Sequence, residues 1–282
     1  MKQHLFILII LTLSAACSKR IDLVLPPYSS KIVVNGEANT DNTFSFQVSR
    51  SLPIMKSNDS TGYLLQNAIV TVSENGVLLG NALYQGGFYV LNQKPKANNN
   101  YTVNVSSPGF PQAKAVFSVP KNLVTNVSYI DSIGLDNEGF KVGQITLNFQ
   151  DDPGVNNYYR LLIRYYNSGQ QTWTPFNFTS NDILFLNNDK LNDGSYIFSD
   201  RTFSGKTKVL LFNVPEGIGS GTPKFEISIK SFTEDYYNYL RQTDSYNQNG
   251  NGLTNDPIIL RSNVANGLGM VGGVSNARDT IF

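Results

Sequence analysis

The sequence predicts an all-β protein with two β-sandwich domains behind a lipidated N-terminal tether. Short segments rich in β-branched and aromatic residues recur along the chain, and turn dipeptides such as Asn75-Gly76 separate them. Only one segment, near residues 233–247, has the spacing of an amphipathic helix. The chain has a single cysteine, so no disulfide can staple a small domain and a hydrophobic core must suffice.

The first 16 residues have the composition of a signal peptide. Lys2 supplies a positive charge, residues 5–13 are apolar except for one threonine, and small residues precede Cys17. This apolar run of about nine residues is too short to span a bilayer, which takes about 20. The small residues before Cys17 resemble a bacterial lipobox, although Ser14 stands where such signals usually have leucine. We expect cleavage after residue 16 and acylation of Cys17, with an ordinary cleaved signal as the alternative.

Residues 17–30 lack periodicity and contain two consecutive prolines, so we expect an extended tether. Residues 31–120 are expected to form the first domain. About seven short strands without a helical pattern are typical of a sandwich of the immunoglobulin or transthyretin type. The predicted strands cover residues 31–36, 43–49, 68–73, 77–84, 88–91, 101–105 and 113–119.

Residues 121–282 are expected to form a larger second sandwich with one helix. In the strand predicted at 157–166, alternation places Tyr159 and Tyr165 on one face and Tyr158 and Tyr166 on the other. Thr233 can cap the helix, because two acidic residues follow it in the first turn. The other strands are predicted at 142–149, 182–186, 196–199, 208–214, 224–232 and 258–262, after a start near Val127.

Composition excludes several classes of function. The net charge is +1, which gives no argument for binding nucleic acid. The only histidine, His4, lies in the predicted signal peptide, so the mature chain lacks Ser-His-Asp and Cys-His arrangements and histidine-ligated zinc. We therefore predict no enzyme activity, no cofactor and no metal site. The Asp151-Asp152 pair before Pro153 is interpreted as turn acids, with a carboxylate-based hydrolase as the least favoured hypothesis.

Three short sequence patterns resemble known binding, turn or modification motifs. Residues 187–194 faintly resemble a calcium loop, but Lys190 occupies a useful ligand position, so a polar loop is favoured. Residues 266–269 contain two glycines that permit tight turns or close packing against a partner. The Asp-Ser-Ile segment at 131–133 and the Asp-Thr-Ile segment at 279–281 resemble short acceptor sites for O-glycosylation.

Aromatic residues are the main candidates for contact with a ligand or partner. Tyr158 and Tyr166 lie on the face of their strand opposite to Tyr159, while Trp173 and Phe176 flank Pro175. Exposed aromatic side chains stack on sugars or anchor protein contacts. The alternative is that these four side chains pack in the core or on the sheet surface.

Several of these segments together resemble the Bacteroidota envelope lipoproteins grouped as domain of unknown function 4249. The resemblance implies a lipid anchor in the outer membrane and a non-catalytic role as accessory or binding partner of a TonB-dependent outer-membrane transporter in nutrient uptake. The alternative is a free-standing surface module for glycan or peptide. The residues after Cys17 leave the cell surface and the periplasmic face both open. The resemblance rests on residues 21–23, 32–36, 49–51, 67–72, 152–153, 157–160, 236–240 and 262–269.

Overall fold

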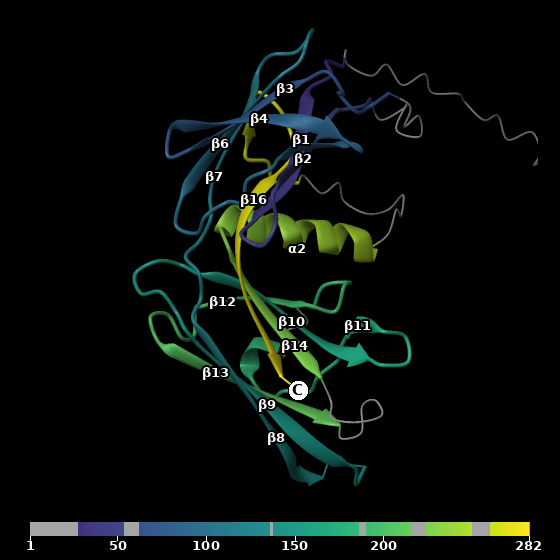
Figure 1. Cartoon of the computed structure of the whole chain (residues 1–282), viewed down its shortest axis with the longest axis vertical. Coiled ribbons are helices and arrows are strands. Elements are labelled where there is room, and N and C mark those ends of the chain that lie inside the picture. Colours follow the sequence, from purple (N-terminus) through teal and green to yellow (C-terminus); the bar gives the residue numbers. More distant parts are fainter. Residues whose placement is uncertain are drawn as a thin grey trace, which may run out of the picture.

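The computed structural model describes residues 28–53, 62–135, 138–185, 190–215, 224–249 and 260–281. The predicted signal peptide and residues 17–27 of the predicted tether lie outside this part of the chain. The described residues form two β lobes with one α-helix between them (Figure 1). This confirms the predicted all-β sandwich class.

Seven of the described strands form most of the N-terminal lobe, and their bounds follow the predicted ones closely. Alternation puts Phe44, Phe46 and Val48 inward, where they are buried among the other apolar side chains of the lobe. The strands are β1 (Ile32–Asn39), β2 (Phe44–Arg50), β3 (Ile69–Glu74), β4 (Val77–Gln85), β5 (Phe88–Leu91), β6 (Asn100–Ser106) and β7 (Ala113–Ser118).

The C-terminal lobe packs a three-stranded sheet, in the order β13-β9-β8, against the sheet that contains β10 and β14. Inward side chains such as Tyr159, Leu161 and Ile163 of β10 meet Ile145 and Leu147 of β9 in a second core. The strands are β8 (Thr125–Leu135), β9 (Lys141–Gln150), β10 (Tyr158–Asn167), β11 (Thr172–Pro175), β12 (Tyr196–Ser199), β13 (Thr207–Pro215) and β14 (Phe225–Phe232).

The end of the chain joins the two lobes. Strand β16 (Val271–Ile281) pairs in parallel with β1 and antiparallel with β14, while β15 (Val264–Ala265) pairs with β7. The predicted close packing of glycines occurs within the chain. A Cβ atom at Gly267 would overlap the carbonyl oxygen of Ile32, and one at Gly269, where φ is +105°, would overlap the carbonyl oxygen of Val34.

Two strand predictions need correction. Residues 182–186 were expected to form a strand, but Ile183–Phe185 form a short 3₁₀ helix, η2. The side chain of Asp182 accepts a hydrogen bond from the Leu184 N–H at 3.0 Å and stabilises this turn. Of the strand predicted at 258–262, residues 258–259 lie outside the described residues, and residues 260–262 are not in a strand.

The helix α2 (Glu234–Asn249) lies between the lobes (Figure 1). It begins after Thr233, whose carbonyl oxygen accepts a hydrogen bond from the Tyr237 N–H at 3.0 Å. Its Tyr236 and Tyr237 rings are buried with Phe232 and Val274 in a third, smaller core. Among the described residues, no helix is long and apolar enough to cross a membrane.

Candidate functional site

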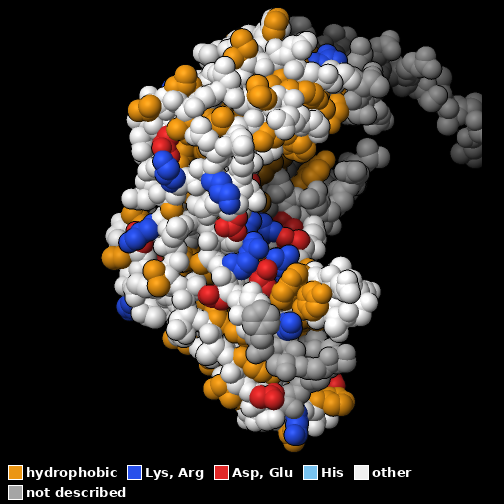
Figure 2. Space-filling model, viewed as in Figure 1, with side chains coloured by type: hydrophobic (Ala, Val, Ile, Leu, Met, Phe, Trp, Pro, Cys, Tyr) orange, Lys and Arg blue, Asp and Glu red, His pale blue; other side chains and the backbone are white. Residues whose placement is uncertain are grey.

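Polar side chains gather on the outer face of the strands that connect the lobes, β10-β14-β16-β1. Because side chains alternate along a strand, Arg160 and Arg164 of β10 point away from the second core, as do Glu226 and Lys230 of β14. Figure 2 shows these charges gathered in the hollow between the lobes. We call this surface, together with Asp193 beside Arg160, the concave face: Glu37, Asn39, Asp41, Arg160, Arg164, Asp193, Glu226, Ser228, Lys230, Asn276 and Arg278.

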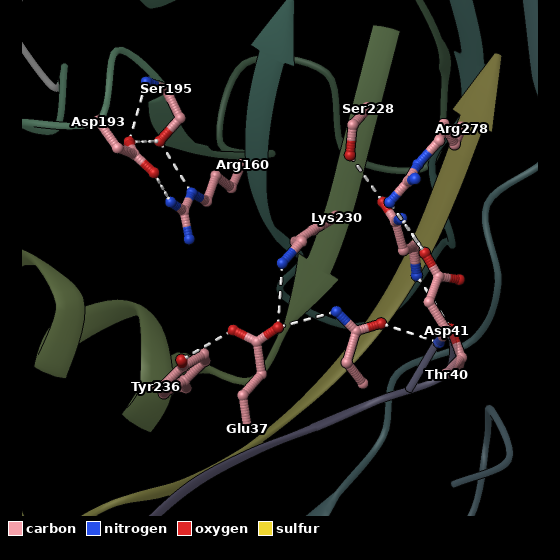
Figure 3. A network of polar contacts seen from close by, with 12 residues as sticks. Glu37, Thr40, Asp41, Arg160, Asp193, Ser195, Ser228, Lys230, Tyr236 and Arg278 are labelled. Atoms are coloured by element: carbon pink, nitrogen blue, oxygen red, sulfur yellow. Dashed lines mark hydrogen bonds and ion pairs between the residues drawn. The ribbon is translucent and has the colours of Figure 1, made fainter. Parts of the chain in front are cut away.

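Glu37 of β1 joins three elements on the concave face (Figure 3). Its Oε1 accepts hydrogen bonds from Lys230 Nζ at 3.0 Å and from Asn39 Nδ2 at 2.8 Å, and its Oε2 accepts one from the Tyr236 hydroxyl at 3.0 Å. Burial raises the pKa of the Glu37 carboxyl, but the Lys230 ammonium and the three hydrogen bonds outweigh burial and lower this pKa below its ordinary value. The carboxylate thus ties the N-terminal lobe to β14 and α2.

Tyr236 completes this junction. Burial, together with the Glu37 carboxylate, raises the pKa of the Tyr236 hydroxyl, so it stays a hydrogen-bond donor. The Tyr236 ring covers Gly272 of β16 so closely that a Cβ atom at Gly272 would overlap it. Glycine at this position therefore lets α2 approach the sheet.

Arg160 forms the second part of the concave face. Its guanidinium pairs with the Asp193 carboxylate, and its Nε donates to Ser195 Oγ at 2.8 Å. Burial raises the pKa of Asp193, but hydrogen bonds from Ser195 and the Arg160 charge lower it overall. These contacts hold the 190–195 segment against β10.

The segment 187–194, which faintly resembles a calcium loop, is only partly described. Residues 187–189 lie outside the described residues, and the Asp193 carboxylate bonds to Arg160 and Ser195.

The third part is a chain of contacts across β10, β14 and β16. Arg164 pairs with Glu226, and Arg278 lies 3.7 Å from Glu226 and 3.2 Å from Asp41. Asn276 Nδ2 donates to Asp41 Oδ2 at 2.6 Å. Glu226 is buried beneath the two arginines, so its charge is compensated before any partner arrives.

The concave face is therefore charged but close to neutral. Four cationic side chains, Arg160, Arg164, Lys230 and Arg278, stand beside four carboxylates, Glu37, Asp41, Asp193 and Glu226. Such a surface does not favour a polyanion. It offers fixed donors and acceptors of both signs, which suits the polar surface of a protein partner.

The four predicted contact residues lie in different settings. The Tyr166 and Trp173 rings meet edge to face with centroids 5.3 Å apart, and Lys224 Nζ lies 6.0 Å from the Tyr166 centroid. Tyr158 contacts Tyr237 of α2, with centroids 4.8 Å apart. Phe176, which follows β11, is 9% exposed and packs in the second core, where its ring meets the Phe225 ring edge to face.

A cleft of about 480 Å³ lies at the junction of the two lobes, and it is lined mainly by residues 118–124, by residues between 150 and 159 and by residues 231–233 just before α2. Asp151 there accepts hydrogen bonds from the Tyr159 hydroxyl and from the Gly205 N–H at 2.6 Å. Asp152 pairs with Lys121 at 3.4 Å. Both carboxylates are thus engaged by the chain, and Asp151 fixes the 200–206 loop to the end of β9.

The described residues contain no group of three or more His, Cys, Asp or Glu side chains placed to hold a metal ion. One buried carboxylate oxygen, Asp200 Oδ2, has no hydrogen-bond partner. It lies outside the lining of the cleft and outside the concave face.

A family model described as domain of unknown function (DUF4249) matches residues 19–280 of the chain. The protein belongs to the DUF4249 family. The match covers both lobes, so the concave face lies within the DUF4249 region. The description of DUF4249 assigns no activity.

Other comparisons add little to the DUF4249 match. No curated protein matches the chain. A crystal structure titled "Putative membrane anchored protein", from Corynebacterium diphtheriae, is 12% identical over 74% of this chain and 56% of its own, with a TM-score of 0.19. A Salmonella alpha-2-macroglobulin mutant is 11% identical over 94% of this chain and 16% of its own, with a TM-score of 0.23. The chain thus spans about half of the first protein and about a sixth of the second.

Proposed function

We propose that this protein is a non-catalytic, lipid-anchored envelope protein that docks on a TonB-dependent outer-membrane transporter and assists nutrient uptake. The concave face carries the proposal, because it is a preformed, nearly neutral polar surface between two lobes. The sequence around Cys17 supports a lipid anchor in the outer membrane. Membership in DUF4249 supports the transporter as partner, through the resemblance noted from the sequence.

The contacts of the concave face suit protein docking for a physical reason. Its ion pairs already fix the side chains in place, so little conformational entropy is lost when a partner binds. Arg278 keeps about half of its side chain exposed and can donate to carbonyl or carboxylate oxygens of a partner.

Co-purification tests the proposal. Tagged protein from detergent-solubilised membranes of the native host should bring down a TonB-dependent barrel, identified by mass spectrometry. Arg278→Glu should weaken the recovery of the barrel, because it reverses the charge of an exposed donor beside Asp41. Lys114→Glu on the exposed side of β7 is the matched control and should leave recovery unchanged. Recovery of no barrel by the unaltered protein would overturn the proposal.

Metabolic labelling tests the anchor separately. Palmitate should enter the unaltered protein and should not enter Cys17→Ser. A protein that takes up no palmitate has no lipid anchor, whatever partner it binds.

A second candidate function is a free-standing module for glycan or peptide. The pair of Tyr166 and Trp173, with Lys224 beside it, favours this function, since a partly exposed aromatic pair next to a cation can stack on a sugar ring or on a peptide side chain. A glycan or peptide array that binds the unaltered protein and not Trp173→Ala would support it. An array without signal at millimolar ligand would count against it.

A further inference from the structure

The end of the N-terminal lobe that lies farthest from the C-terminal lobe carries exposed apolar side chains. The register that pairs Val70 with Ala82 places Ile69 beside Leu83, and Leu83 pairs with Val90 of β5. Phe88 lies two residues from Val90, on the same face of β5. Ile69, Leu83 and Phe88 are 63%, 64% and 44% exposed. These three residues form an apolar row across three strands.

The tether reaches the lobe at the same end. Tyr28 is the first described residue, and its hydroxyl donates to Ser51 Oγ. Lys31 N–H donates to the same oxygen at 2.9 Å, and β1 begins at the next residue. Ser51 comes directly after β2. The C-terminal end of β2 lies beside the turn that leads into β5. Tyr28 itself is 48% exposed and extends the apolar surface.

The charged side chains that the structure describes at this end are all cationic. Within the described segments 28–33, 48–53, 62–69, 83–90, 104–113 and 266–268, the charged residues are Lys31 and Arg50, both exposed, and there is no Asp or Glu. Figure 2 shows apolar side chains over the upper lobe and few charged ones near its top. Exposed apolar side chains beside cations, without acidic residues, suit the interface of a phospholipid bilayer.

We infer that this apolar end, formed by Tyr28, Ile69, Leu83 and Phe88 with Lys31 and Arg50, rests on the bilayer that holds the acylated Cys17. The inference builds on the lipid anchor of the proposed function. Ten residues lie between Cys17 and Tyr28, so even a fully extended tether of eleven residue steps keeps this end within about 40 Å of the membrane surface. At such a short range the effective concentration of lipid is high, and a weak apolar contact suffices to orient the molecule. The concave face is then held away from the lipid and free for a protein partner.

Site-directed fluorescence tests the inference with the full acylated protein in vesicles of phosphatidylethanolamine and phosphatidylglycerol. An environment-sensitive dye is attached at Gln85→Cys, which is exposed beside Phe88. The matched control is Val209→Cys on β13 of the other lobe, where the native side chain is 48% exposed. The Gln85 label should shift its emission to shorter wavelength and be quenched by spin-labelled lipid, while the Val209 label should do neither.

The triple variant Ile69→Ser, Leu83→Ser, Phe88→Ser should lose the shift at Gln85 and still float with the vesicles through its acyl chains. Floating protein with equal emission at both labels, or with the shift retained in the triple variant, would overturn the inference and leave the anchor intact. Protein that does not float overturns the anchor as well. These vesicles contain no transporter, so failure to recover a barrel is a separate result.

Discussion

The concave face and the apolar end differ in the chemistry of their exposed side chains. On the concave face, each charged side chain has a partner of opposite sign, and Glu226 is even buried beneath two arginines. At the apolar end, large side chains such as Ile69 and Leu83 are mostly exposed to solvent. The charges of the concave face are paired within the chain. The apolar end, in contrast, is proposed to be covered by the lipid bilayer.

The two surfaces contribute differently to the stability of the folded protein. Removing a side chain from the concave face breaks contacts that join the lobes, so the folded state should lose free energy. Removing one from the apolar end breaks few contacts, so only membrane binding should change.

The first prediction concerns Gly272, where Tyr236 covers the sheet. Gly272→Ala should lower the free energy of unfolding by about 1–3 kcal/mol, because the new methyl group overlaps a buried ring. Gly134→Ala is the control, since a Cβ atom at Gly134 meets nothing within 4 Å, and it should change stability by less than about 0.5 kcal/mol. Equal effects of the two substitutions in urea unfolding would show that α2 does not depend on close packing at Gly272.

The second prediction concerns Glu37. Glu37→Gln should cost about 1–2 kcal/mol at neutral pH, because Lys230 and Tyr236 lose a charged acceptor at the junction of the lobes. Lys96→Gln breaks the pair with Glu74, in which the lysine side chain is 71% exposed, and should cost less than about 1 kcal/mol. Denaturant unfolding of both variants measures the contrast, and a larger loss for Lys96→Gln would contradict it.

The third prediction is the pH dependence of the same contact. The pKa of Glu37 is lower in the folded protein than in the unfolded chain, so its stabilising effect is complete above the ordinary carboxyl pKa. This effect is lost as the pH falls through the lowered pKa of Glu37. The difference in unfolding free energy between unaltered protein and Glu37→Gln should therefore shrink in acid. A difference that stays constant from pH 7 to acid would contradict the lowered pKa.

The smallest effect on stability is expected at the apolar end. Ile69→Ser and Leu83→Ser should each change the free energy of unfolding by less than about 0.5 kcal/mol, because both side chains are mainly in solvent. Val70→Ser, one residue away in a fully buried position, should be strongly destabilising. Large losses from Ile69→Ser in thermal unfolding would mean that the apolar end is covered within the folded chain.

The sequence predicted the N-terminal lobe well because its strands follow one another with clear alternation and strong turn signals. Phe44, Phe46 and Val48 illustrate this, since period-two burial is a local property. The start of α2 was also predictable, because Thr233 and the acids after it are local signals.

The C-terminal half depended on contacts that are distant in sequence. Strand β16 was not predicted, because its small and polar residues carry no strand pattern, and it forms only between β1 and β14. The short β11 depends in the same way on its pairing with β10.

The sequence predicts which side chains of the concave face point outward, but not which of them meet. The alternation of Tyr158 and Tyr159 also implies that Arg160 and Arg164 point outward, and Glu226 and Lys230 alternate with buried residues in the same way. The sequence could not show that β14 lies beside β10 or that Glu37 meets Lys230, because these pairs are separated by up to 193 positions.

Photocrosslinking from the concave face tests whether this face docks on a transporter. A benzophenone amino acid at Leu162, which lies between Arg160 and Arg164 on β10, should crosslink to a TonB-dependent barrel in intact cells of the native host. The same group at Val209, on the outer side of the three-stranded sheet, should not. No barrel adduct from Leu162, or an equal yield from Val209, would contradict docking through the concave face.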